Sequence, residues 1–148
     1  TFNNFTLNNT NTAGRNRVVS YAGTNTYVTL KNNTLNGSVA TTTTSTWNAV
    51  IYNEFGKGTE FCTVDSNTIN GGSSGMYWYG GGTTVFEDGN SITNNTINDP
   101  YYIGINFYYQ TGGTVSNNTI ETSTRSTTTS YGINYQYGNT TINYRLGT

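Results

Sequence analysis

The sequence lacks histidine altogether and has a single cysteine, a single proline and few charged residues. Without histidine, a Ser-His-Asp triad, a His-based zinc site and a histidine general base are all excluded. The lone Cys62 cannot form an internal disulfide or a thiolate metal cluster. Because it lies in the apolar stretch EFCTV without an adjacent cation, we expect a small buried side chain rather than a reactive thiol. We therefore expect no metal and no cofactor.

Charge is equally sparse. The six Lys and Arg residues and seven Asp and Glu residues give a formal net charge of −1, so nucleic acid is not an expected partner. No apolar run approaches the roughly 20 residues of a membrane span, and no leader peptide opens the chain. Because it begins at Thr1, we interpret it as a mature fragment. The scattered arginines are expected to be solvated; they are Arg15, Arg17, Arg125 and Arg145.

Threonine and asparagine dominate what is present, with 31 and 24 residues beside 18 Gly and 13 Tyr. Strong helix formers are scarce, whereas Thr, Tyr, Val, Ile and Phe suit a pleated sheet. The aromatic-rich, nearly neutral composition differs from that of a disordered chain. At 148 residues the chain has the size of one ordinary domain. We therefore expect one all-β unit over residues 1–148.

A short phrase recurs as LKNNTLNGS, VDSNTINGG, ITNNTINDP and VSNNTIETS. The apolar residue near its end forms one column along the chain, and an apolar or aromatic residue five positions earlier forms a second. Separations within the first column are 28, 34, 28 and 23 residues, far longer than a helix or strand period. The first column contains Leu7, Leu35, Ile69, Ile97 and Ile120, and the second contains Phe2, Leu30, Val64, Ile92 and Val115.

A third column comes from the stretches VVSYAG, AVIYNE, GMYWYG, GINFYY and GINYQY. In each, an apolar residue is followed two positions later by an aromatic one, which is strand periodicity with both side chains on one face. We expect both sets to point inward, and the flanking Tyr77, Tyr79 and Tyr108, of opposite parity, to point outward. The apolar set is Val19, Val50, Met76, Ile105 and Ile133, and the aromatic set is Tyr21, Tyr52, Trp78, Phe107 and Tyr135.

Self-similarity at this period indicates a solenoid, a propeller or an array. Helical repeats are excluded by the missing 3.6-residue pattern, propellers by the missing blade signatures, and leucine-rich repeats by a total of four Leu. The pattern therefore predicts a right-handed parallel β-helix of about five to six coils. Successive coils of such a fold stack about 4.8 Å apart.

Asparagine stands two residues before the first column, where the odd spacing between two inward columns requires a corner. Asn tolerates the left-handed backbone of a sharp corner, and equivalent Asn side chains in successive coils can form a hydrogen-bonded ladder. In the first coil Phe5 occupies this position, and we expect the ladder to fail there. The predicted ladder consists of Asn33, Asn67, Asn95 and Asn118.

Two carboxylates are the candidate catalytic pair. Glu60 and Asp88 both fall four residues before the second column, so they are expected in neighbouring coils. Carboxylates about 5 Å apart have the separation found in retaining glycosidases. A chance alignment on a solvated acidic surface gives the same spacing. Asp88 also lies in the variable loop 80–90, and loops on a regular scaffold are where function usually sits.

Three tyrosines are the candidate ligand-binding residues. Exposed rings in a row, as predicted for Tyr77, Tyr79 and Tyr108, are suited to stacking on sugar faces. Cross-strand tyrosine pairs also stabilise a bare sheet without any ligand. Both interpretations stay open at this point.

The stretches KNNTL, DSNTI, TNNTI and SNNTI and the GIN strands resemble the right-handed parallel β-helix repeat family, which is pectin-lyase-like in the broad sense. More narrowly, the coils resemble repeat segments of large secreted bacterial surface adhesins. The resemblance covers essentially the whole chain and implies a secreted or cell-surface location. Its members include polysaccharide lyases, glycoside hydrolases and non-catalytic adhesins, so it implies architecture rather than activity.

From these observations we expect a non-catalytic structural or adhesion module, a β-helical stalk or filament segment with a glycan-binding face. The alternative is a polysaccharide lyase or glycoside hydrolase that uses Glu60 and Asp88. Both ends of the chain stop inside a repeat, and uncapped coils leave unpaired strand edges. We therefore expect a fragment of a longer array, or copies that stack end to end. The expected partners are an environmental or cell-surface glycan and further β-helical coils.

Overall fold

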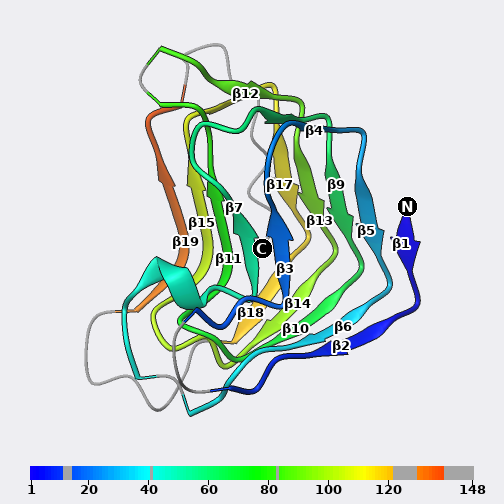
Figure 1. Ribbon diagram of the computed structural model, residues 1–148, viewed down its shortest axis with the longest axis vertical. Coiled ribbons are helices and arrows are strands. Elements are labelled where there is room, and N and C mark those ends of the chain that lie inside the picture. The colour runs from blue at the N-terminus through cyan, green and yellow to red at the C-terminus, as the bar shows by residue number, and fades with distance from the viewer. Residues whose placement is uncertain (12–14, 41, 83, 122–129, 139–148) are drawn as a thin grey trace.

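The computed structural model describes residues 1–11, 15–40, 42–82, 84–121 and 130–138. Within this part the chain is built from short strands, and the only helix is the 3₁₀ turn η1 (Thr46–Asn48). The strands form three five-stranded parallel sheets around a common interior (Figure 1). The architecture is a parallel β-helix, as the sequence predicts.

Each sheet takes one strand from each coil. The first sheet contains β1 (Phe2–Asn3), β5 (Thr29–Lys31), β9 (Thr63–Asp65), β13 (Ser91–Thr93) and β17 (Thr114–Ser116). The second contains β2 (Thr6–Asn8), β6 (Thr34–Asn36), β10 (Thr68–Asn70), β14 (Thr96–Asn98) and β18 (Thr119–Glu121). The third contains β3 (Val19–Tyr21), β7 (Ile51–Asn53), β11 (Ser74–Tyr79), β15 (Ile103–Tyr108) and β19 (Tyr131–Gln136). Two short pairs close the coils between the third and first sheets, β4 (Asn25–Thr26) with β8 (Thr59–Glu60) and β12 (Glu87–Asp88) with β16 (Gln110–Thr111).

The first two predicted columns are confirmed residue by residue. In the second sheet, Ile69 pairs with Leu35 on one side and with Ile97 on the other. In the first sheet, Val64 pairs with Leu30 and Ile92 in the same way. Because side chains at one register position point to the same face of a parallel sheet, these residues stack into continuous interior rows.

The third column is wrong by one residue in the second coil. Ile51, and not Val50, pairs with both Val19 and Met76. Tyr52 therefore pairs with Tyr77 on the outward face, and Asn53 takes the inward position. A slip of one residue exchanges the two faces of a strand. The adjacent apolar residues of the stretch AVIY made either register compatible with the pattern.

Val50 is nevertheless fully buried, because it lies at a corner above a glycine. A Cβ added to Gly37 would lie 2.7 Å from Val50 Cγ2, so the missing side chain makes room for the valine. Gly104, in the first of the two GIN stretches, has a similar cause. A Cβ added to Gly104 would lie 2.5 Å from Ile120 Cγ2, so this strand packs closely against the second sheet.

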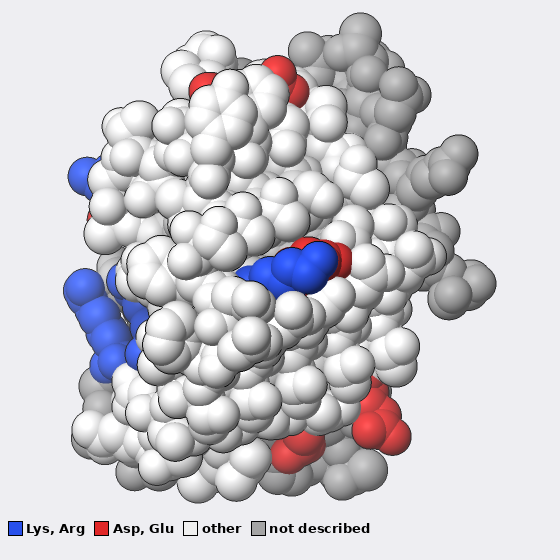
Figure 2. Space-filling model, turned by 90° about the vertical axis from the view of Figure 1, so that its right-hand side faces the viewer, with Lys and Arg blue, Asp and Glu red and all other residues white. Residues whose placement is uncertain are grey.

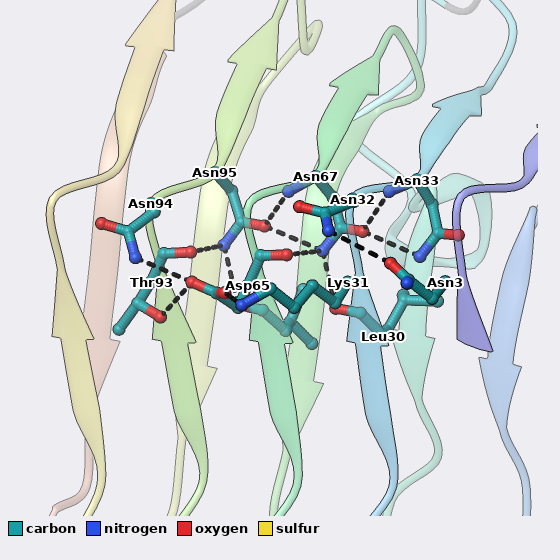
Figure 3. A network of polar contacts seen from close by, with 11 residues as sticks. Asn3, Leu30, Lys31, Asn32, Asn33, Asp65, Asn67, Thr93, Asn94 and Asn95 are labelled. Atoms are coloured by element: carbon teal, nitrogen blue, oxygen red, sulfur yellow. Dashed lines mark hydrogen bonds and ion pairs between the residues drawn. The ribbon is translucent and has the colours of Figure 1, made fainter. Parts of the chain in front are cut away.

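The asparagine ladder is confirmed (Figure 3). The Nδ2 group of Asn33 donates to Asn67 Oδ1 at 3.0 Å, Asn67 donates to Asn95 Oδ1 at 3.0 Å, and Asn95 donates to Asn118 Oδ1 at 2.9 Å. Each acceptor oxygen also receives the backbone N–H of the preceding ladder residue. As expected, no side-chain rung is possible at Phe5, where only the backbone N–H donates to Asn33 Oδ1, at 2.9 Å.

The prediction that the ladder asparagine itself adopts the left-handed backbone of the corner is wrong by one residue. The left-handed residue is the one before each ladder asparagine, while the ladder residue itself begins the next segment. This arrangement turns the ladder side chain inward, where its Nδ2 also reaches a backbone carbonyl; Asn67, for example, donates to Leu30 O at 2.8 Å. The left-handed residues are Asn32 (φ 54°), Ser66 (φ 56°), Asn94 (φ 55°) and Asn117 (φ 55°).

An ion pair crosses the outer face of the first sheet. Lys31 Nζ lies 2.7 Å from Asp65 Oδ2, and Asp65 Oδ1 accepts hydrogen bonds from Thr93 Oγ1 at 2.9 Å and Asn94 Nδ2 at 2.7 Å (Figure 3). Burial by itself would raise the pKa of Asp65, but these partners outweigh it and hold the pKa at about 2. Most of the face seen in Figure 2 is uncharged.

Burial falls off along the helix axis. Trp78 and Phe107, in central coils, are fully buried, whereas Phe2 in the first coil is 57% exposed and Tyr135 in the last described coil is 39% exposed. The inward rows are thus most deeply buried in the central coils, although Tyr21 and Val115 on the edge strands β3 and β17 are also only 4% and 2% exposed.

Candidate functional site

The outward residues of the third sheet form two rows that run along the helix axis. Strands β11, β15 and β19 each have six residues, which leaves room for two outward positions per coil. The first row contains Tyr52, Tyr77, Asn106 and Asn134. The second contains Tyr79, Tyr108 and Gln136.

The tyrosine rings of these rows pack against one another. The ring centroids of Tyr77 and Tyr79 lie 5.6 Å apart, and those of Tyr79 and Tyr108 lie 5.1 Å apart, with interplanar angles of 24° and 28°. Tyr137 continues the row, with its centroid 6.0 Å from that of Tyr108. The outward orientation predicted for Tyr77, Tyr79 and Tyr108 is confirmed, and the structure brings the three rings together.

A shallow groove of about 400 Å³ lies between and beside these rings. Its walls combine phenol rings with amide side chains, and of the described residues that line it none carries a charge. Such a volume lies near the lower end of the range for small-molecule sites. The lining residues are Thr46, Tyr77, Tyr79, Tyr102, Ile103, Asn106, Tyr108, Tyr131, Asn134, Gln136 and Tyr137.

The amides of the groove form a directed hydrogen-bond chain. Gln136 Nε2 donates to Asn134 Oδ1 at 3.1 Å. Asn134 Nδ2 in turn donates to Asn106 Oδ1 at 2.8 Å and to Tyr108 Oη at 3.0 Å. This series of hydrogen bonds orients the side chains of Asn106, Asn134 and Gln136 before any ligand is present. A polar surface fixed in this way loses little conformational entropy on binding.

The aromatic surface extends past the groove to η1. The rings of Trp47 and Tyr52 are stacked 5.8 Å apart, and the rings of Tyr52 and Tyr77 are 5.3 Å apart. Arg17 lies over the face of Tyr52, with its Cζ 3.5 Å from the ring centroid, and Arg15 Cζ lies 3.8 Å from that of Trp47. Burial lowers the pKa of Arg17.

The expectation of a solvated side chain is therefore wrong for Arg17, which is partly buried beneath its cation–π contact with Tyr52. Arg15 is exposed, as expected, although its guanidinium group also lies over Trp47. Neither the Arg nor the Trp recurs from coil to coil, so the repeat gave no signal for them. Arg125 and Arg145 lie outside the described residues.

A buried carboxylate supports the tyrosine row from the interior. Glu87 Oε2 accepts from Asn53 Nδ2 at 2.8 Å and from Gln110 Nε2 at 3.0 Å. The same two amide groups also donate to the backbone carbonyls of Tyr79, at 3.2 Å, and Tyr108, at 3.0 Å. Burial raises the pKa of Glu87, although the hydrogen bonds from its donors oppose that effect. The network thus ties the strand ends that present two groove tyrosines.

The network continues to the first sheet. Asn90 Nδ2 donates to Gln110 Oε1 at 2.9 Å, and Asn90 Oδ1 accepts from the Cys62 N–H at 3.0 Å. Cys62 is 1% exposed, and burial raises the pKa of its thiol. The predicted role of Cys62 as a small buried side chain is confirmed. This network could not be predicted from the sequence, because its members look like ordinary polar loop residues.

Glu60 and Asp88 lie in neighbouring coils, as expected from the spacing. The Phe61 N–H donates to the Asp88 carbonyl at 2.8 Å, which sets the two coils side by side at this point. Asp88 Oδ1 accepts from Thr111 Oγ1 at 3.2 Å. Neither carboxylate lines the tyrosine groove. Among the described residues no group of three or more His, Cys, Asp or Glu side chains is placed to hold a metal ion.

Comparison with protein-family models, with curated proteins and with solved structures finds no match for this chain. The strand register itself establishes the β-helical architecture. A β-helix carries no activity by virtue of its fold, so function must be argued from the surface that it presents. In the part of the chain that the structure describes, no helix is long and apolar enough to cross a membrane.

Proposed function

We propose that the protein is a non-catalytic secreted or cell-surface module that binds glycan through the groove on its third sheet. The observation that carries the proposal is the close placement of the Tyr77, Tyr79 and Tyr108 rings beside the amides of Asn106 and Asn134. The apolar face of a sugar ring packs on an aromatic ring, and its hydroxyl groups pair with amides. The groove offers both kinds of contact within one surface.

Rigidity of the scaffold supports the proposal. The residues of the groove lie mainly on strands whose neighbours in adjacent coils pair in register, and the buried Glu87 network fixes two of the strand ends. A binding surface built on regular strands is held more precisely than one on loops. The likeness of the NNT phrases to repeat segments of bacterial adhesins agrees with a surface location.

Alanine substitutions at Tyr79 and Tyr108 test the proposal. Tyr27→Ala is the matched control, because this ring is 75% exposed and stacks on Phe61 outside the groove. After a glycan array has identified a ligand, calorimetry should show that Tyr79→Ala or Tyr108→Ala weakens binding by about fivefold, since an aromatic contact contributes about 1 kcal/mol beyond area burial. Tyr27→Ala should bind normally.

Thermal unfolding of the same variants separates binding from a structural role. If the tyrosines serve only to stabilise the sheet, the substitutions should lower the melting temperature while the wild-type protein binds no glycan on the array. That result would contradict the proposal. Loss of binding with little change in melting temperature would support it.

Catalysis by Glu60 and Asp88 is the second candidate, favoured by their placement in neighbouring coils. An enzyme should release shorter products from its glycan, and Glu60→Gln or Asp88→Asn should abolish that release. Chromatography of each glycan before and after incubation decides between the two candidates. Cleavage by the wild-type protein that either variant loses would overturn the non-catalytic proposal.

We further propose that another β-helical coil covers the N-terminal end. Within the described ranges, the edge strands β1, β2 and β3 each have a partner on one side only, and an apolar hollow of about 330 Å³ opens there. Phe2, Phe5 and Leu7 are 57%, 53% and 40% exposed. Unpaired edges of this kind invite strand addition. The 148-residue chain should therefore associate end to end in sedimentation experiments at rising concentration, and strictly monomeric behaviour would contradict stacking of copies.

A further inference from the structure

Asn106 is the most deeply buried polar side chain of the groove. It is 2% exposed, and its Oδ1 accepts from Asn134 Nδ2. No hydrogen bond among the described residues uses its Nδ2 group, although this residue lines the groove. The Nδ2 group is not among the fully enclosed unpaired polar atoms of the described residues, so it keeps contact with the groove. An acceptor oxygen of a ligand can therefore take the place of water at this donor.

The neighbouring hydroxyl groups are donors as well. Tyr108 Oη accepts from Asn134 Nδ2, which leaves its own hydrogen free to point toward a ligand. Burial raises the pKa of Tyr77 and of Tyr79, so both phenols keep their protons at neutral pH. The Asn106 Nδ2 group and the Tyr108 hydroxyl group therefore offer neutral donors to an acceptor-rich molecule.

Among the described residues that line the groove, none is a cation that could compensate a negative charge on a ligand. The faces of aromatic rings are electron-rich and repel anions, and burying an unpaired carboxylate or sulfate is costly. The nearest candidates among the described cations, Arg15 and Arg17, are stacked over Trp47 and Tyr52 and do not line the groove.

From this geometry we infer that the groove selects an uncharged glycan segment, and that the Asn106 Nδ2 group donates a hydrogen bond to one of its oxygen atoms. The inference rests on the proposed function, because it names the class of ligand for the same groove. Asn106 would then set specificity, while the rings supply most of the contact area.

The test compares binding of two sets of oligosaccharides by calorimetry. The uncharged set consists of cello-, manno-, xylo- and chito-hexaose, and the acidic set consists of oligogalacturonate and chondroitin sulfate hexamers. Wild-type protein should bind at least one uncharged member and neither acidic one. Asn106→Ala should weaken that binding by about fivefold to tenfold, the usual effect of losing one hydrogen bond. Asn70→Ala, which removes an amide from the outer face of the second sheet, should leave the affinity unchanged.

Each of the other possible results refutes one element of the proposal. Preferential binding of the acidic set would refute the inference and leave glycan binding standing. Binding of an uncharged glycan that is unchanged in Asn106→Ala would refute the role of Asn106. Failure to bind any carbohydrate, in these sets or on the array, would overturn the proposed function itself. Wild-type selectivity needs no substitution, so the inference stays testable if Asn106→Ala does not fold.

Discussion

Replacing Asn67 by alanine should cost the protein a large part of its stability. Asn67 is 1% exposed, and its side chain bonds in several directions. It accepts from the backbone N–H of Asn33 at 2.9 Å and from Asn33 Nδ2 at 3.0 Å. It donates to Leu30 O at 2.8 Å and Asn95 Oδ1 at 3.0 Å. Alanine removes all of these bonds together and leaves the Asn33 N–H without its acceptor.

The expected loss follows from these contacts. A buried hydrogen bond contributes about 1 kcal/mol net, and an unsatisfied buried group costs about 1–3 kcal/mol. We therefore expect Asn67→Ala to lower the free energy of unfolding by about 3–5 kcal/mol. Domains of this size are typically stable by about 5–15 kcal/mol, so the variant should unfold at a clearly lower urea concentration.

Asn70→Ala is a control from the same coil. Asn70 also belongs to an asparagine row, donating to Asn36 Oδ1 at 2.7 Å and accepting from Asn98 Nδ2 at 2.9 Å. This row lies on the outer face, where water can replace the lost partner, so the expected cost is below about 1 kcal/mol. Urea unfolding followed by circular dichroism measures both variants. Equal destabilisation by Asn67→Ala and Asn70→Ala would refute the argument that burial makes the inner ladder strong.

Two further predictions concern pH and have opposite signs. The pKa of Asp65 is lowered to about 2 from an ordinary 3.8, so its contribution to stability is present above about pH 4 and is lost as pH falls toward 2. Asp65→Asn should remove this acid-dependent loss. Urea unfolding at a series of pH values from 2 to 7 measures the free energy of unfolding, and an equal decrease toward pH 2 in the variant and the wild type would contradict the prediction. Burial raises the pKa of Glu87 above its ordinary 4.5, so the stability contributed by protonated Glu87 is complete below about pH 4.5 and is lost as pH rises through the raised pKa. The stability of Glu87→Gln relative to wild type should therefore increase as pH rises over that range, and a constant difference would show that Glu87 does not titrate there.

Much of the fold could be predicted because the chain repeats itself. Where one residue type recurs at equivalent positions, as for Ile69 and its partners or for the ladder asparagines, the sequence directly indicates which residues stack. Phe5 was recognisable as the end of the ladder for the same reason. The outward orientation of Tyr79 and Tyr108 followed from strand parity alone.

The failures lie where repetition is lost. Val50 and Ile51 follow a long insertion, and two adjacent apolar residues could not fix the register. The left-handed corner residue was misplaced by one position because NN pairs offer two candidates of the same type. Arg17 and Glu87 are not repeated at the equivalent positions of other coils. The pattern therefore could not indicate that Arg17 stacks on Tyr52 or that Glu87 is buried among amides.

The fall in burial toward the ends of the β-helix has a mechanical consequence. Each coil contacts chiefly the coils beside it, so tension applied at the termini would detach terminal coils one at a time while the central coils remain intact. The two ladder positions Asn67 and Asn95 are 28 residues apart, and a fully extended segment of that length spans about 90–100 Å. A pulled molecule would therefore lengthen in successive steps set by the 23 to 34 residues of each coil, and would dissipate load gradually instead of rupturing in a single event.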